Sequence, residues 1–180
     1  GDRITRVGLA TGAIPSGAEV IDLRPYTAIP GLIDLHTHMT YYWDPASGTK
    51  PLDRVQRTPA ELAQLAAANA RRTLETGVTT VRDLGAGGGA DYLMRDQIAA
   101  GTMSGPRMFV AGQGISGGRG GGPAVDTIPG LVEARVKAGS DWIKVYASRG
   151  SYQSVDTTQT LTFDQIKAIV DAAHAAGKPV

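Results

Sequence analysis

Short apolar runs alternate along the chain with longer segments in which apolar residues recur every three or four positions. The apolar runs cover residues 28–38, 78–83, 108–111 and 142–147. The longer segments cover residues 59–75, 91–100, 127–137 and 162–176. Runs of the first kind are typical of buried strands, and the second pattern is typical of amphipathic helices. The sequence therefore predicts strands and helices in alternation, with a fifth strand beginning at residues 178–180.

Two of the predicted helices carry clear start signals. Thr58 is followed by Pro59 and Glu61, and Thr162 is followed three positions later by Gln165. A Thr N-cap with Glu or Gln at the third helical position forms a capping box, and Pro is favoured at the first position. In the last helix we expect the apolar stripe to comprise Phe163, Ile166, Ile169, Val170 and Ala173.

Alternation of strands and helices indicates a parallel sheet. The strand spacing matches a (β/α)8 barrel, which uses ~250 residues for eight units. We therefore predict an α/β fold in which residues 28–180 form the N-terminal half of a TIM-like barrel. Residues 1–27, with alternating apolar positions and turns, are predicted to be part of a small β-sandwich domain. A doubly wound open sheet fits the same strand and helix pattern.

Half of a barrel would leave two open sheet edges. We therefore expect the chain to be one piece of a longer protein, with the missing C-terminal half of the barrel as its partner. The chain begins with Gly1 rather than Met, so we expect the true N-terminus to be absent. The sequence leaves the compartment open between the cytoplasm and export.

Composition excludes several classes of protein. The 18 basic and 17 acidic residues leave a net charge of +1 without a basic run, which argues against nucleic-acid binding. The absence of cysteine excludes disulfides and thiolate metal sites. No apolar stretch approaches the roughly 20 residues of a membrane helix. A small-molecule substrate and assembly into a homo-oligomer both stay compatible with the sequence.

Two histidines end the first predicted strand. Side chains alternate along a strand, so His36 and His38 point to the same side, with Asp34 one step deeper. Barrel enzymes keep their sites at the carboxyl ends of their strands, where two imidazoles can bind one zinc ion. Ordinary hydrogen bonds at a wet strand end would explain the same pair.

A lysine lies inside the fourth predicted strand. Trp142, Lys144 and Tyr146 share one face, and Ile143 and Val145 share the other. Both faces of a barrel strand are covered, so Lys144 must be neutralised, paired or modified. A desolvated amine is nucleophilic and can add carbon dioxide to form a carbamate, an anionic metal ligand. A structural ion pair, or an amine that reaches the rim, is the alternative.

Two glycine-rich motifs follow the third strand. Residues 112–117 match the dinucleotide fingerprint G-x-G-x-x-G, and residues 114–118 match the serine-hydrolase motif G-x-S-x-G. Both motifs must open a helix, which the following Gly-Arg-Gly-Gly-Gly-Pro cannot do promptly. We therefore set aside nucleotide binding and serine hydrolysis. His174, on the last helix, is expected to be a structural or surface residue.

Five segments, in order, span nearly the whole chain: residues 31–38, 77–83, 105–107, 138–144 and 172–180. Together they resemble the amidohydrolase superfamily, specifically its imidazolonepropionase-like and Xaa-Pro dipeptidase-like branch, which includes ochratoxinase-like amidases. The resemblance implies a hydrolase that cleaves a small-molecule amide or peptide bond, such as a dipeptide or an N-acyl amino acid.

The resemblance also implies a site with two divalent metal ions, zinc by expectation. His36 and His38 would hold the more buried ion, and Lys144, carboxylated by carbon dioxide, would bridge both as a carbamate. A bridging water would be the nucleophile. The family takes two further histidines from strands five and six and a general-base aspartate from strand eight. These lie outside this segment, which alone is expected to be inactive.

The glycine-rich loop departs from the family pattern. Relatives often carry a histidine there, whereas this chain has Arg119, which could bind a substrate carboxylate bidentately or point into solvent. Tyr42, in the loop after the histidines, could line a substrate pocket or pack the loop. Two other functions stay open: a mononuclear deaminase or cyclic amidase with unmodified Lys144, and a non-catalytic barrel fragment.

Overall fold

The computed structural model describes residues 3–9, 13–41, 58–118, 121–150 and 157–180. The chain divides into two units, Gly1–Pro30 and Gly31–Val180. Within its described residues the first unit has turns but no strand, and its apolar side chains, such as Val7, are exposed. The short strands expected before residue 28 are therefore not formed there, because a strand requires a partner for its backbone groups. The assignment of residues 1–27 to a β-sandwich domain stays a prediction.

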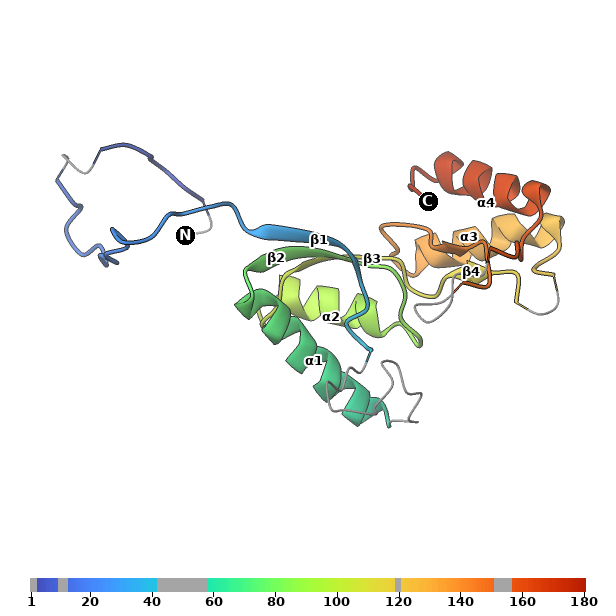
Figure 1. Cartoon of the computed structure of the whole chain (residues 1–180), viewed down its shortest axis with the longest axis horizontal. Helices are drawn as coiled ribbons and strands as arrows, with labels where there is room; N and C mark the ends of the chain where they lie inside the picture. The colour runs from blue at the N-terminus through green and yellow to red at the C-terminus, as the bar shows by residue number, and fades with distance from the viewer. Residues whose placement is uncertain (1–2, 10–12, 42–57, 119–120, 151–156) are drawn as a thin grey trace. The chain divides into compact units, whose positions relative to one another are not determined.

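The second unit begins with a parallel three-stranded sheet in the order β1-β2-β3 (Figure 1). Its strands are β1 (Leu32–Thr37), β2 (Val78–Asp83) and β3 (Arg107–Val110). Helices α1 (Pro59–Glu75) and α2 (Ala90–Ala99) connect the strands and lie on one side of the sheet (Figure 1). The parallel pairing confirms the strand–helix alternation predicted from the sequence.

A compact apolar core joins this sheet to its helices. Ala66 and Ala70 of α1 face Val81 of β2, and small alanine side chains let the helix approach the strand closely. The buried members of this cluster are Met39, Ala66, Ala70, Val81, Met94, Met108 and Val110. The capping box predicted at Thr58 forms in full with Glu61. This core fixes the carboxyl ends of β1 and β2, where the predicted histidines lie.

The remainder of the unit contains a two-stranded parallel sheet and two helices. The elements are β4 (Ile115–Ser116), the 3-10 helix η1 (Val125–Thr127), α3 (Ile128–Lys137), β5 (Val145–Tyr146) and α4 (Phe163–Ala175). Their shared core consists of Ile115, Ile128, Val132, Ile143, Leu161, Ile169 and Ala173. Ile143 and Val145, predicted to share one face, both pack into this core, and the capping box predicted at Thr162 is formed.

Several sequence-based boundaries were wrong. The fourth predicted strand, 142–147, shrinks to β5, because Asp141 and Trp142 each donate one backbone hydrogen bond to Val110 instead of joining a ladder. Residues 178–180 form no strand, although the Pro179 carbonyl accepts a hydrogen bond from the Ile143 N–H at 2.9 Å. Phe163 is 74% exposed at the first position of α4, so it is not part of the buried stripe.

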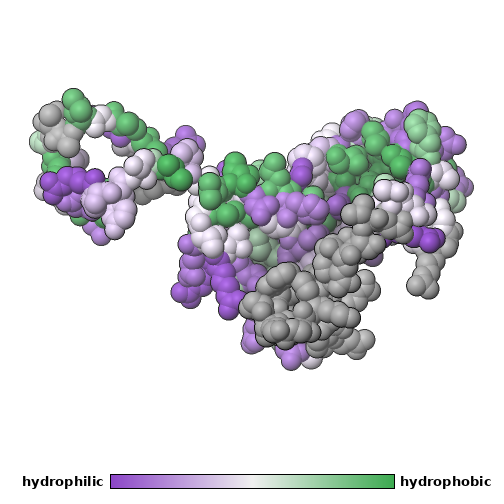
Figure 2. Space-filling model, in the orientation of Figure 1, coloured by the Kyte–Doolittle hydropathy of each residue, from purple (hydrophilic) through white to green (hydrophobic). Residues whose placement is uncertain are grey.

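The described residues do not close into a barrel. They form separate three-stranded and two-stranded sheets, and the three-stranded sheet ends at β1. Hydrophobic surface lies along β1 in Figure 2, where Leu32, Ile33 and Leu35 are each more than half exposed. The α/β class is confirmed, whereas the half-barrel stays a proposal. In the described part of the chain, no helix has the length and apolar character required to cross a membrane.

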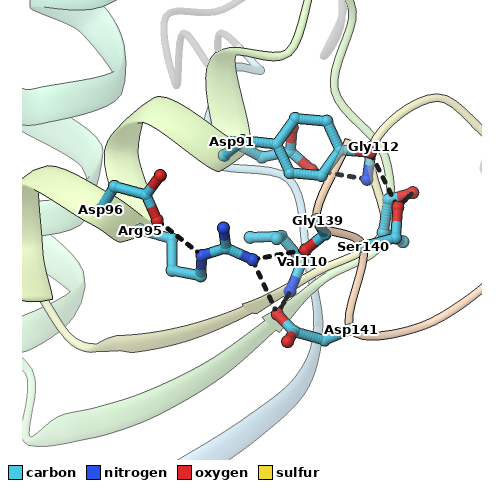
Figure 3. A network of polar contacts seen from close by, with 10 residues as sticks. Asp91, Arg95, Asp96, Val110, Gly112, Gly139, Ser140 and Asp141 are labelled. Atoms are coloured by element: carbon cyan, nitrogen blue, oxygen red, sulfur yellow. Dashed lines mark hydrogen bonds and ion pairs between the residues drawn. The ribbon is translucent and has the colours of Figure 1, made fainter. Parts of the chain in front are cut away.

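A polar network holds the segment before β5 against β3 and α2 (Figure 3). Arg95 of α2 donates to the Gly139 carbonyl at 2.6 Å and to the Asp141 carboxylate at 3.3 Å. The same carboxylate accepts the Val110 N–H at 2.9 Å. Ser140 donates to the Ala111 carbonyl at 3.1 Å and contacts the Tyr92 hydroxyl at 2.7 Å. This network fixes the segment that leads through Lys144 into β5.

Candidate functional site

His36 and His38 lie together at the carboxyl end of β1, as the sequence predicts. Their ring centroids are 5.2 Å apart, with the ring planes at 62°. His36 is exposed and its backbone N–H donates to the Asp34 carboxylate at 2.9 Å, whereas His38 is half-buried. Asp34 therefore supports the backbone of His36.

Both imidazoles are disposed to be neutral. Partial burial lowers the pKa of His36 and His38 below the usual value, and the charge of Lys144 acts in the same direction on both. The hydrogen bond to Gly85 raises the pKa of His38 but only partly offsets this. Nδ1 of His38 lies 3.1 Å from the Gly85 carbonyl oxygen. Because a carbonyl oxygen only accepts hydrogen bonds, this contact requires a proton on Nδ1 and leaves the Nε2 lone pair free for a metal ion.

Lys144 lies near enough to the histidines for its charge to lower the pKa of both. The side chain is partly buried, and burial followed by the nearby charge of Arg82 lowers the pKa of the amine. Its Nζ is 4.9 Å from the centroid of the Tyr146 ring. No carboxylate forms an ion pair with Lys144 in the described ranges of the chain, so a structural ion pair does not account for it there. The unprotonated amine is the form that reacts with carbon dioxide, and a lowered pKa makes that form more abundant.

Arg82 accounts for part of this electrostatic environment. Its guanidinium lies 4.4 Å from the Trp142 ring centroid, and Nε donates to the Leu35 carbonyl at 2.7 Å. These contacts place a fixed positive charge near Lys144. The sequence analysis missed this role, although the position of Arg82 in a strand next to the histidine strand was a usable signal.

Two tyrosines border the histidines. The Tyr41 ring stacks on His38 with centroids 4.2 Å apart and planes at 9°. The Tyr146 side chain is hydrogen-bonded to Tyr41, and burial raises the pKa of Tyr146. Sequence reasoning did not assign a role to Tyr146. Tyr42 and Arg119, the two predicted substrate contacts, lie outside the described residues.

The described residues supply part of a metal ligand set. They contain no group of three or more His, Cys, Asp or Glu side chains that could hold a metal ion. Two neutral imidazoles can donate nitrogen lone pairs to a metal ion, and the hydrogen bond of His38 leaves its Nε2 free for this. The Lys144 amine, with its lowered pKa, could add a ligand once it carries carbon dioxide. His174 is exposed on α4, in agreement with the surface role predicted for it.

A buried carboxylate at the end of β2 was missed by sequence reasoning. Asp83 is fully buried, and its two oxygens accept the Met39 N–H at 2.6 Å and the Gly85 N–H at 3.3 Å. Burial raises the pKa of Asp83 to about 7, and the charge of Asp91 acts in the same direction. An aspartate at the carboxyl end of a buried strand was a signal that could have drawn attention to it.

The raised pKa of Asp83 is expected to make the stability of the folded protein depend on pH. Its pKa is about 7 in the folded protein and near 3.8 when solvated, so between these values the folded state binds more protons than the unfolded state. Its contribution to the free energy of unfolding therefore falls as pH rises from about 4 to 7, by up to about 4 kcal/mol. The lowered pKa values of His36 and His38 act in the opposite direction.

The measurement is therefore a difference between two proteins. Urea unfolding of the metal-free wild type and the Asp83→Asn variant at several pH values gives the wild-type advantage at each pH. We expect that advantage to shrink as pH rises from 4 to 7. An advantage that is constant or grows with pH would contradict a raised pKa at Asp83.

Comparisons with known proteins identify the family and the fold. Residues 27–180 match the family model described as the amidohydrolase family. The fold is similar to an amidohydrolase at 26% identity and to a Xaa-Pro dipeptidase with bound methionine at 29%, both with a TM-score of 0.73. Each match covers 93% of this chain and 46% of the other chain. No curated protein matches the chain.

The A. niger ochratoxinase shares the fold alone. Its identity is 23% and its TM-score 0.58, over 82% of this chain and 41% of that protein. The family match spans most of the sequence, including both histidines and Lys144. The chain belongs to the amidohydrolase family, and its structural neighbours include Xaa-Pro dipeptidase-like and ochratoxinase-like members.

Proposed function

We propose that this chain supplies the N-terminal half of a (β/α)8 barrel in a metal-dependent hydrolase that cleaves an amide or peptide bond. The proposal rests on two neighbouring imidazoles, His36 and His38, at the end of β1, and on the charge of Lys144, which acts on both, in a chain of the amidohydrolase family. The chain spans 46% of the length of the similar amidohydrolase and of the Xaa-Pro dipeptidase. The remaining metal ligands would therefore come from other parts of the complete protein.

The proposed substrate is a dipeptide or an N-acyl amino acid. A Xaa-Pro dipeptidase is among the similar structures at 29% identity, and phenylurea hydrolase B shares the fold at 23%. Tyr41 and Tyr146 place two hydroxyl-bearing rings beside the histidines, where they could bind polar groups of a peptide. The proposed substrate class rests on the two tyrosine rings beside the histidines and on the family to which the chain belongs.

The chain's own side chains would hold and tune two divalent metal ions. His36 and His38 would bind the deeper ion, and Lys144, as its carbamate, would bridge the pair. When bound, such ions supply a water molecule of lowered pKa and polarise the scissile carbonyl. The lowered pKa of each histidine keeps the imidazoles unprotonated at neutral pH, so protons do not compete for their nitrogen atoms.

The experiment that tests this proposal is a hydrolysis screen with the full-length protein. The panel contains Xaa-Pro dipeptides, other dipeptides and N-acyl amino acids, with free amine release as the readout. We expect turnover of at least one class, loss of turnover after chelation, and recovery with zinc and bicarbonate. Turnover that survives exhaustive chelation would contradict metal dependence. Release of ammonia from an aminated ring, with no peptide cleavage, would favour the mononuclear deaminase instead.

A further inference from the structure

We propose that Asp83 is a positioning residue that holds His38 in one ring orientation and one tautomer, with Nδ1 protonated and Nε2 directed to the metal. The inference rests on the proposed function, because it assigns His38 as a ligand. Asp83 does not touch the His38 ring. It acts through the two backbone segments on either side of the ring, those of Met39 and Gly85.

A closed loop of contacts connects these residues. The Asp83 carboxylate accepts the N–H of Met39, the residue after His38, at 2.6 Å. Its other oxygen accepts the N–H of Gly85 at 3.3 Å. The Gly85 carbonyl then lies 3.1 Å from Nδ1 of His38. The carboxylate therefore fixes both the backbone from which the ring extends and the acceptor to which the ring donates.

The backbone at Gly85 is shaped for this contact. Its φ is +148°, and a Cβ atom there would lie 2.8 Å from the Tyr146 hydroxyl and 3.6 Å from Cε1 of His38. Only glycine fits comfortably between the two rings. Since Asp83 is fully buried, water cannot take the place of its carboxylate oxygens as hydrogen-bond acceptors without opening the core. The Gly85 carbonyl is held from two sides: Asp83 accepts the Gly85 N–H, and the Ala86 N–H, in the same peptide group as that carbonyl, donates to the Gly112 carbonyl at 3.2 Å.

Other contacts hold the far side of the same turn. The Asn69 side chain donates to the carbonyl oxygens of Met39 and Tyr41, both at 2.9 Å. Tyr41 stacks on the His38 ring. These contacts restrain the turn after His38 but do not select the ring tautomer, because none of them is made to Nδ1 or Nε2. The tautomer depends on the Gly85 carbonyl, which the Asp83 hydrogen bond to the Gly85 N–H helps to position.

The test uses Asp83→Asn in the full-length protein. Asparagine keeps the volume but has one oxygen acceptor, so either the Met39 or the Gly85 N–H faces an NH2 group and loses its partner. The matched control is Asp91→Asn. Asp91 is equally buried, and one of its oxygens accepts the N–H of Gly112, whose carbonyl in turn accepts the Ala86 N–H. Asparagine keeps this bond through its own oxygen, because the other carboxylate oxygen of Asp91 has no hydrogen-bond partner.

Two readouts separate positioning from a merely structural role. ¹⁵N NMR of the metal-free proteins reports which His38 nitrogen carries the proton. We expect Nδ1–H in the wild type and in Asp91→Asn, and a mixture of tautomers in Asp83→Asn. We also expect the zinc dissociation constant to rise about 10- to 100-fold in Asp83→Asn, as for other residues that orient a metal-binding histidine, and to be unchanged in the control.

Three outcomes decide the proposal. Equal tautomers and equal zinc affinity in the two variants would overturn it. If Asp83→Asn fails to fold, the wild type still decides, because a proton on Nε2 of His38 would overturn it directly. A wild type that binds no zinc would sink the hydrolase proposal, whereas a tautomer mixture confined to Asp83→Asn would still show that Asp83 sets the ring tautomer of His38.

Discussion

His36→Ala or His38→Ala in the full-length protein removes tight zinc binding and lowers kcat/KM for the amide substrate by about three orders of magnitude, or about 4 kcal/mol of transition-state stabilisation. The physical reason is the shared face of the two imidazoles at the end of β1, with centroids 5.2 Å apart. Either ring alone leaves one nitrogen donor where the proposed site needs two. Metal content and kinetics, measured on the same preparation, check this prediction.

His174→Ala is the matched control for both variants. This third histidine is exposed on α4 and belongs to no cluster of metal-binding side chains among the residues that the structure describes. We expect it to keep wild-type zinc content and kcat/KM. If His36→Ala or His38→Ala behaves like His174→Ala, the paired histidines are ordinary strand-end residues and the metal site lies elsewhere.

Lys144→Ala is expected to produce a loss of similar size, and one that a small carboxylate partly reverses. Burial and Arg82 lower the pKa of Lys144, which favours the uncharged amine that adds carbon dioxide. Removing the side chain leaves space where acetate or propionate can supply the missing carboxylate oxygens. We therefore expect these acids to restore part of the activity of Lys144→Ala. We also expect the metal-free wild type to regain activity with zinc only when bicarbonate is added.

The control is Lys167→Ala, which removes an exposed lysine that pairs with Asp171 one turn along α4. It should reconstitute like the wild type. ¹³C NMR after incubation with labelled bicarbonate should show a carbamate signal in the wild type and in Lys167→Ala, but none in Lys144→Ala. Full activity in protein reconstituted without bicarbonate, with Lys144 unmodified, would favour a single metal ion and the deaminase-like mechanism.

Local sequence signals predicted the elements whose boundaries depend on local interactions. The strand 78–83 was predicted to the residue, and both capping boxes form where Thr58 and Thr162 indicated. The fourth strand was predicted too long, because its pairing depends on Val110 and Pro179, which are distant in sequence. The short strand β4 was missed because its two residues lie within a glycine-rich segment that is typical of loops.

In the candidate site, too, local patterns identified some residues, whereas residues that depend on distant contacts were missed. Strand alternation and the family resemblance identified His36, His38 and Lys144, since each lies at or near a strand end. Asp83 was missed because its function depends on a contact with Met39, 44 positions away, which no local pattern encodes. Exposure of Phe163 was likewise missed, because Leu161, two residues earlier, is the side chain that fills the core beside α4.

Anomalous X-ray scattering at the zinc edge, from crystals of the full-length protein prepared with zinc and bicarbonate, examines the metal site itself. We expect two peaks about 3.5–4 Å apart, with His36 and His38 bound to one of them and additional density on the Lys144 amine lying between both. A single peak beside an unmodified Lys144 would contradict the two-metal site. No peak after zinc addition, with both histidines in ordinary hydrogen bonds, would contradict a metal-dependent hydrolase altogether.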